Sequence, residues 1–265
     1  MVNFYSIILS PYTLILCILS LIYLFRDKLE EYLANLIIVL IQRQQKRQRP
    51  RRIFLVRHGN SVANNNYDIL QQIPDNKIVL SEKGIAQAKE AGKRLKEIIG
   101  NESIEFYVSP YMRTRQTYEN ILESFKENRT ECNIFSPLRE QEYGNLQSEM
   151  DRQFKEQKEV GIPYYRFKNG ESGIDVLNRI SVFLQYLFRK ISSTNYKLFD
   201  NIIIVSHELT LKFFILCFLK LPVNDYDNIK GLDNADFWTI EKNENGKYQL
   251  KNDISFKRAK SSIIY

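Results

Sequence analysis

The sequence predicts an α/β fold, a three-layer sandwich in which helices flank a mostly parallel central sheet. Two observations lead to this prediction. Short β-branched runs alternate with segments of helical period, and the strongest run, 202–205, is apolar at every position. Alternating strands and helices favour parallel pairing, and a strand that is apolar on both faces needs a cover on both. A hydrophobic content of 44% with 26% charged residues is typical of a globular protein.

The individual elements follow from residue 51 onward. Ser81 is a typical N-cap residue, and the helical period that follows it extends to about residue 99. Strands are expected at 52–56, 104–109, 133–135 and 202–205, with further edge strands at 235–240 and 248–254. Helices are expected at 81–99, 112–125, 174–191 and 209–219, and the polar stretch 147–159 predicts a solvent-facing helix or lid.

An uncharged apolar segment, Phe4 to Phe25, predicts a transmembrane anchor before this domain. As a helix it would be about 33 Å long, enough for a hydrocarbon core of about 30 Å. It lacks the basic start and the shorter apolar stretch of a cleavable signal peptide. A helix buried in a protein core is the alternative interpretation.

Two features separate this anchor from the domain. Residues 29–41 carry apolar side chains at helical spacing, which predicts an amphipathic helix on a membrane or a partner. The run 43–52 is basic and contains no acid, so it nearly accounts for the net charge of +7. We therefore expect an anchor over 1–27, an amphipathic helix and basic linker over 28–50, the α/β domain over 51–256 and a tail over 257–265.

The basic run also bears on location. The positive-inside rule places the domain on the cytoplasmic or the matrix side of a single-pass membrane protein, and we favour the mitochondrial inner membrane. A basic run can also bind nucleic acid. This one lacks interleaved aromatic residues and follows an apolar segment, so we expect membrane lipid and no nucleic acid as partners.

The chain has two histidines, and each follows an apolar, β-branched run. His58 follows residues 53–56, with Arg57 beside it, and His207 follows residues 202–205. Ligands bind at the carboxyl ends of strands in open α/β sheets, and histidine can accept phosphate or carry protons near neutral pH. The pair therefore predicts one site in which two distant segments meet. For either histidine alone, a satisfied core residue is the alternative.

Four motifs contain the candidate chemistry. They are residues 55–61 continuing to Asn64, 109–117 with Arg113, 138–144 with Glu140, and 205–208. Arginine binds phosphate oxygens through two hydrogen bonds, neutral imidazole can attack phosphorus, and a buried carboxylic acid can protonate a leaving oxygen. No P-loop, dinucleotide fingerprint or Ser-His-Asp elbow is visible, and the cysteines lack metal-ligand spacing. We expect no metal and no cofactor.

In this order, the four motifs resemble the histidine phosphatase superfamily, the phosphoglycerate-mutase-like fold, over about residues 51–254. Residues 165–172 also resemble the branch with fructose-bisphosphatase domains and small plant and bacterial phosphoglycerate-mutase-like proteins. The resemblance implies that His58 is the nucleophile and Glu140 the general acid and base. It also implies that Arg57, Arg113 and His207 line the phosphate pocket, with Asn64 at its rim.

The sequence departs from this resemblance at Glu208, where many relatives have glycine, and at Leu209, where mutases have a polar residue. A carboxylate at 208 repels phosphate or narrows the pocket if it points inward, or meets the lid if it points away. Hydrolysis is favoured over isomerisation. The expected function is a membrane-anchored phosphohydrolase that forms a phosphohistidine and acts on a small phosphorylated metabolite or a phosphoprotein. The alternative is an accessory or scaffold subunit of a membrane complex, such as a mitochondrial respiratory one, with weak or no activity.

Overall fold

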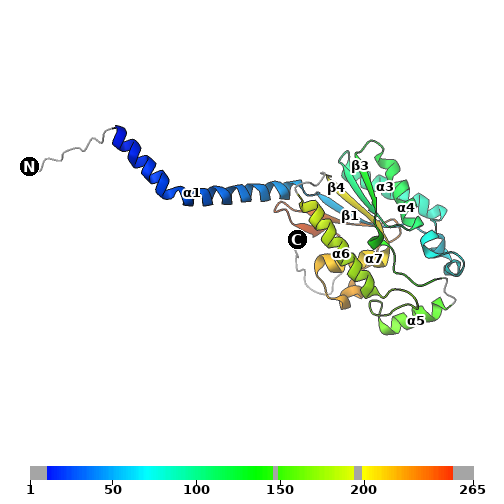
Figure 1. Cartoon of the computed structure of the whole chain (residues 1–265). Coiled ribbons are helices and arrows are strands. Elements are labelled where there is room, and N and C mark those ends of the chain that lie inside the picture. Colours follow the sequence, from blue (N-terminus) through cyan, green and yellow to red (C-terminus); the bar gives the residue numbers. More distant parts are fainter. Residues whose placement is uncertain (1–10, 146–148, 194–198, 253–265) are drawn as a thin grey trace, which may run out of the picture. The chain divides into compact units, whose positions relative to one another are not determined.

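The computed structural model describes residues 11–145, 149–193 and 199–252 (Figure 1). The chain divides into two compact units, Met1–Arg47 and Gln48–Tyr265. The first is built from one long helix, α1 (Pro11–Gln48), and the second contains the sheet and all other elements.

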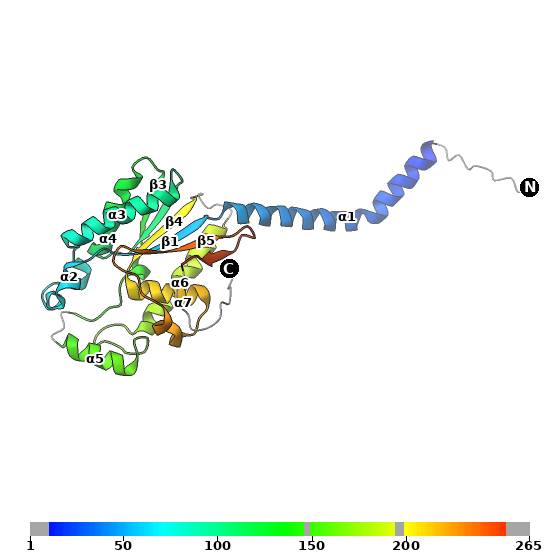
Figure 2. The same cartoon turned by 180° about the vertical axis from the view of Figure 1, so that it is seen from behind.

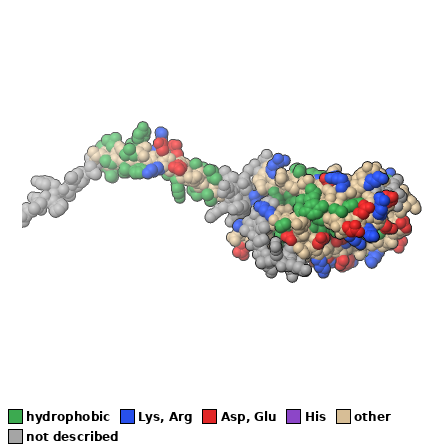
Figure 3. Space-filling view, turned by 90° about the horizontal axis from the view of Figure 1, so that it is seen from below, with side chains coloured by type: hydrophobic (Ala, Val, Ile, Leu, Met, Phe, Trp, Pro, Cys, Tyr) green, Lys and Arg blue, Asp and Glu red, His purple; other side chains and the backbone are tan. Residues whose placement is uncertain are grey.

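From Pro11 to Gln48, helix α1 is continuous across the predicted boundaries between the anchor, the amphipathic helix and the basic linker. No glycine or proline interrupts residues 12–48, which explains why the predicted basic linker is helical as far as Gln48. The side chains of residues 11–40 are exposed, and Figure 3 shows apolar ones on both sides of a charged group. Within the part of the chain that is described, no helix is long and apolar enough to cross a bilayer. Residues 4–10 of the predicted anchor lie outside that part.

The second unit is built on a mixed, mostly parallel sheet of six strands with the order β3-β2-β4-β1-β5-β6. The strands β3, β2, β4 and β1 are parallel, and β5 and β6 are antiparallel to their neighbours. The strands are β1 (Arg52–Arg57), β2 (Ile104–Val108), β3 (Thr130–Ile134), β4 (Asn201–Ser206), β5 (Phe237–Lys242) and β6 (Tyr248–Leu250). The strand predicted at 235–240 forms as β5, but the prediction that it lies at an edge of the sheet is wrong, because β5 lies between β1 and β6.

Helices cover both faces of this sheet, as the sequence predicts (Figures 1 and 2). Alternate residues of one strand enter the two halves of the core: Ile53 and Leu55 pack on one side, Phe54 and Val56 on the other. One face carries α3 (Glu82–Ile99) and α4 (Met112–Leu122); the other carries α6 (Gly173–Ser192) and α7 (Glu208–Leu219). Ser81 caps α3 by accepting a hydrogen bond from the Gly84 backbone N–H.

Short elements complete the domain, most of them at the end of the sheet where β1 and β4 finish. They are α2 (Val62–Asn65), α5 (Met150–Val160) and five 3-10 helices: η1 (Tyr67–Gln71), η2 (Asp75–Lys77), η3 (Glu123–Phe125), η4 (Ser136–Leu138) and η5 (Val223–Asn228). Arg57 of β1 is in register with Ser206 of β4. The residues that follow, His58 and His207, therefore leave neighbouring strands at the same level of the sheet.

Candidate active site

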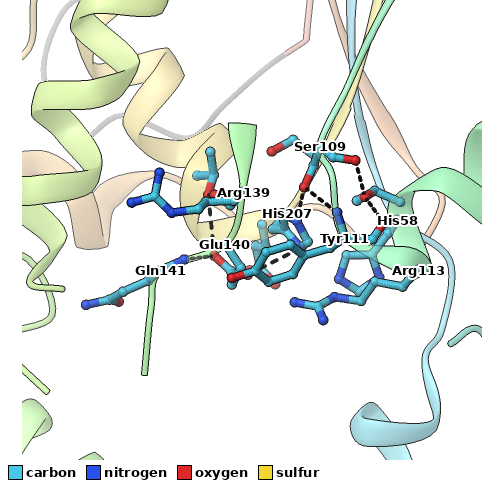
Figure 4. Close-up of polar contacts among 12 residues, drawn as sticks. His58, Ser109, Tyr111, Arg113, Arg139, Glu140, Gln141 and His207 are labelled. Atoms are coloured by element: carbon cyan, nitrogen blue, oxygen red, sulfur yellow. Dashed lines mark hydrogen bonds and ion pairs between the residues drawn. The ribbon is translucent and has the colours of Figure 1, made fainter. Parts of the chain in front are cut away.

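The two histidine rings meet across the ends of β1 and β4 (Figure 4). Their centroids lie 5.2 Å apart, and both side chains are almost completely buried. The turn after His58 is held close to the start of α3, since a Cβ on Gly59 would lie 2.5 Å from the Gly84 carbonyl oxygen. Glycine at 59 thus permits a backbone approach that fixes where the His58 ring emerges.

The hydrogen bonds of His58 define which ring nitrogen is reactive. Its Nδ1 lies 2.7 Å from the carbonyl oxygen of Gly59, which can only accept, so Nδ1 carries the proton and Nε2 has a free lone pair. Burial, Arg113 and Arg57 lower the pKa of His58 well below its usual 6.5. The ring is therefore neutral at neutral pH, the form that attacks phosphorus.

His207 is held by Ser109, at the end of β2. The Ser109 hydroxyl lies 2.8 Å from His207 Nε2, and Ser109 Oγ also accepts a hydrogen bond from the Tyr111 backbone N–H. When the hydroxyl donates to Nε2, Nδ1 carries the proton, and this buried nitrogen has no hydrogen-bond partner among the described residues. It lies 3.8 Å from Glu140 Oε2. Burial, followed by Arg113 and His58, lowers the pKa of His207 well below 6.5.

Both predicted phosphate-binding arginines are paired with carboxylates. Arg113 contacts Asp75 of η2 at 2.6 Å and 3.3 Å, and it also donates to the Asp75 carbonyl oxygen. Arg57 Nη1 lies 2.6 Å from Glu208 Oε2. Arg57 Nε is buried and has no hydrogen-bond partner among the described residues, so one donor of this guanidinium is unused. Glu208 points inward to the arginine, the first of the two orientations considered from the sequence.

Glu140 lies opposite the histidines, on the loop after η4. Its Oε1 accepts a hydrogen bond from the Gln141 backbone N–H at 2.9 Å. Burial, opposed by Arg113 and helped by Asp75, raises the pKa of Glu140 to about 7. Near neutral pH this carboxyl group can therefore both donate and accept a proton.

Arg179 of α6 holds the Glu140 loop in place. Its guanidinium donates to the carbonyl oxygens of Pro137, Arg139 and Glu140, and it is paired with Glu171 at 3.0 Å. The side chain is largely buried, so these contacts replace water. Arg179 and Glu171 thus fix the backbone that presents the candidate acid.

A cavity of about 190 Å³ is lined by four of the predicted groups, Arg57, His58, Arg113 and Glu140, whereas His207 is fully buried and is not among its lining residues. Its lining includes Arg57, His58, Asn64, Tyr67, Asp75, Arg113, Glu140, Tyr143, Glu208 and Tyr226. A second cavity of about 430 Å³ adjoins it, since the two share Leu70, Asp75 and Tyr143. Among the described residues, no group of three or more His, Cys, Asp or Glu side chains is placed to hold a metal ion.

The structure brings five of the six site residues predicted from the sequence into one cluster: Arg57, His58, Arg113, Glu140 and His207. Asn64 also lines the cavity, but its side-chain oxygen accepts hydrogen bonds from the backbone N–H and hydroxyl of Ser61, which closes the N-cap of α2.

Three further residues were not predicted as part of the site: Asp75, Ser109 and Arg179. Ser109 ends the predicted strand 104–109 and begins the motif 109–117, and this position was an available signal. Asp75 lies in a short 3-10 helix and Arg179 in the middle of a long helix, where nothing in the sequence distinguishes them from surface charges.

Several known proteins resemble this chain in sequence. The family model of the histidine phosphatase superfamily (branch 1) matches residues 53–253. Phosphoglycerate mutase-like protein AT74H of Arabidopsis thaliana is 36% identical over 224 residues, 77% of this chain and 78% of that protein. Broad-range acid phosphatase DET1 of Saccharomyces cerevisiae is 24% identical over 297 aligned residues, 77% of this chain and 89% of that protein.

Solved structures show the same fold. Mycobacterial glucosyl-3-phosphoglycerate phosphatase superposes with a TM-score of 0.61 at 20% identity, and the match covers 78% of this chain and all of that one. The α-ribazole phosphatase of Shigella flexneri gives a TM-score of 0.60 at 20% identity, with 80% of this chain and all of that one covered.

Proposed function

The chain belongs to branch 1 of the histidine phosphatase superfamily and is a phosphatase, and from this premise we propose that it hydrolyses phosphate monoesters through a phosphohistidine on His58. The observation that carries the proposal is the neutral His58 ring, whose free Nε2 shares a cavity with two arginines and with Glu140. Arg57, Arg113 and His207 supply positive or proton-donating groups around a bound phosphoryl group.

In the first half-reaction, His58 Nε2 forms a bond to phosphorus while the bond from phosphorus to the ester oxygen breaks. The leaving oxygen takes the proton of Glu140, so an alcohol and an ionised Glu140 result. A Glu140 pKa of about 7 makes this proton available in weakly acidic and neutral solution.

In the second half-reaction, ionised Glu140 takes a proton from water, and the water oxygen attacks phosphorus as the bond to His58 Nε2 breaks. Inorganic phosphate leaves, and both Glu140 and His58 return to their starting states. Arg113 and Arg57 stabilise charge on the equatorial oxygens in both steps.

Hydrolysis by the full-length protein tests this proposal. The protein should release phosphate from p-nitrophenyl phosphate and from small phosphorylated metabolites between about pH 5 and 8. The His58→Asn variant keeps the size of the side chain and removes the nucleophile, so it should lose nearly all activity. Absence of turnover by the wild-type chain would overturn the proposal.

The size of the first cavity favours a small phosphorylated metabolite over a phosphoprotein as the substrate. Its volume of about 190 Å³ matches a phosphoryl group with a short alcohol, and the adjoining cavity extends the space. Comparison of phosphorylated metabolites with a phosphopeptide at equal concentration tests this preference.

We further propose that the N-terminal segment attaches the enzyme to a membrane. The support is the apolar surface of α1, since soluble proteins rarely expose so many large apolar side chains together. We place the domain on the cytoplasmic or matrix side and favour the mitochondrial inner membrane. The full-length protein should float with liposomes, and a chain lacking residues 1–25 should not.

Mild detergent extraction tests the alternative role as an accessory subunit. A free enzyme should migrate near its monomer mass. Migration with a large assembly, together with absence of phosphatase activity, would favour the scaffold role instead.

A further inference from the structure

Each arginine that lines the two cavities already has a carboxylate partner. Among the described lining residues the positively charged side chains are three arginines, because His58 is neutral. Each has a carboxylate partner: Arg57 with Glu208, Arg113 with Asp75, and Arg139 with Glu171. Among the described lining residues, a substrate phosphate therefore finds each arginine already in contact with a carboxylate.

The fold leaves room for the Glu208 side chain beside the smaller cavity. It is the first residue of α7, directly after His207, and its carboxylate lines the smaller cavity. A Cβ at position 231 would lie 1.9 Å from Glu208 Oε1, so Gly231 leaves the space in which this carboxylate rests. The Glu208 side chain is 38% exposed, so ligands can reach it.

A bound phosphoryl group changes the surroundings of Glu208. Once a phosphate oxygen binds Arg57, Glu208 either gives up the guanidinium or shares it with a second anion. Both outcomes leave one negative charge without a full partner. Lys212 is the nearest candidate replacement, but its Nζ lies 3.9 Å above the Tyr226 ring and forms no ion pair with Glu208 in the described structure.

The adjoining cavity adds more negative charge. It is lined by Glu142 and by Asp75, which is common to both cavities. Glu140 enters the reaction protonated, so the described lining of the two cavities then contains three ionised carboxylates, Asp75, Glu142 and Glu208, and three arginines, Arg57, Arg113 and Arg139. Because the bound phosphate adds further negative charge, a second anionic group on the substrate is disfavoured beside Glu208 and Glu142, and a cationic group is favoured.

We propose that Glu208 selects phosphate monoesters whose alcohol carries a cationic nitrogen, that is, phosphorylated amino alcohols. The inference rests on the proposed phosphatase function. The phosphate of such a substrate pairs with Arg57 and its ammonium group pairs with Glu208, so each charge keeps a partner. Substrates with a neutral or an anionic alcohol leave Glu208 unpaired or repelled.

Three substrates that share a two-carbon alcohol test the proposal. They are O-phosphoethanolamine with a cationic end, ethyl phosphate with a neutral end and phosphoglycolate with an anionic end. With the full-length protein we expect kcat/KM to fall in that order, by about fivefold per step, the effect of one partly exposed ion pair. The E208Q variant should bring the three kcat/KM values within about twofold of one another. It should lower kcat/KM for the cationic substrate and raise it for the anionic one.

The matched control is Glu90→Gln, the same chemical change on the solvent face of α3, which should preserve the wild-type order. If E208Q fails to fold, Glu208→Ala provides the same comparison. The proposal is wrong if the wild-type protein shows no such order, or if E208Q changes all three substrates by one factor, as expected when Glu208 only positions Arg57. Failure of the proposed phosphatase function would give a different result from failure of the selectivity, because the wild-type protein would then hydrolyse neither these esters nor p-nitrophenyl phosphate.

Discussion

The pH dependence of activity depends on Glu140, the candidate acid whose burial raises its pKa to about 7. Cleavage of an alkyl phosphate requires the protonated form. With this pKa, the protonated fraction falls from about 90% at pH 6 to about 9% at pH 8, so the rate of alcohol release should fall about tenfold. His58 does not contribute to this decrease in rate between pH 6 and pH 8, because its lowered pKa keeps the ring neutral over the whole range.

Substitution of Glu140 by glutamine should remove this dependence together with the proton transfer. We expect the rate for an alkyl phosphate such as ethyl phosphate to drop by about 10²–10⁴-fold and to become flat between pH 6 and 8. Formation of the phosphoenzyme from p-nitrophenyl phosphate should drop much less, since p-nitrophenolate leaves without a proton.

Single-turnover measurements on both substrates between pH 5 and 9 provide the assay. Glu90→Gln, on the exposed surface of α3, serves as the control and should retain the wild-type pH profile. The assignment of Glu140 would be refuted if Glu140→Gln kept the descending limb near pH 7, or lost both substrates equally.

Three further perturbations test the supporting contacts. Arg179→Met removes the donors that hold the Glu140 loop and leaves Glu171 with one fewer partner. We therefore expect kcat to fall at least tenfold and the free energy of unfolding to fall by about 3 kcal/mol. Arg189→Met, on the exposed side of the same helix, should change neither quantity, and equal effects of the two would contradict the role of Arg179. Ser109→Ala removes the hydroxyl beside His207 Nε2. We expect kcat/KM to be about tenfold lower and the imidazole ¹⁵N resonances of His207 to shift. Unchanged resonances would exclude this contact. Because burial lowers the pKa of His58 and His207, the folded state binds fewer protons than the unfolded state below pH 6.5. Stability should therefore fall as the pH drops below about 6.5, by up to about 1.4 kcal/mol per pH unit for each histidine, and the difference between wild type and His207→Asn in denaturant titrations should shrink over that range.

Much of the fold could be predicted from the sequence because its signals are local. Residues 53–56 and 202–205 are apolar on both faces, so they had to be central strands with helices on each side. Ser81 marks the start of α3 through its own hydrogen bond to the backbone. In contrast, nothing in 237–242 shows that β5 pairs with β1, because strand order is set by contacts between distant segments.

The two histidines of the candidate site were predicted because each directly follows a strand, whereas the roles of Arg113 and Glu140 came from the family resemblance. Parallel pairing of β1 and β4 brings His58 and His207 together without any further information. Asp75 and Arg179 could not be found in this way, because they reach the site from a 3-10 helix and from the middle of α6. The sequence showed that Glu208 was unusual, but the direction of its side chain depends on the space beside Gly231.

The most direct measurement of the central claim is to trap the phosphoenzyme. The full-length protein is mixed with ³²P-labelled p-nitrophenyl phosphate, quenched with base within milliseconds, digested and mapped by mass spectrometry. We predict one acid-labile label on His58, bonded to Nε2, and none in the His58→Asn variant. Turnover without any labelled protein, or a label on another residue such as His207, would contradict the account.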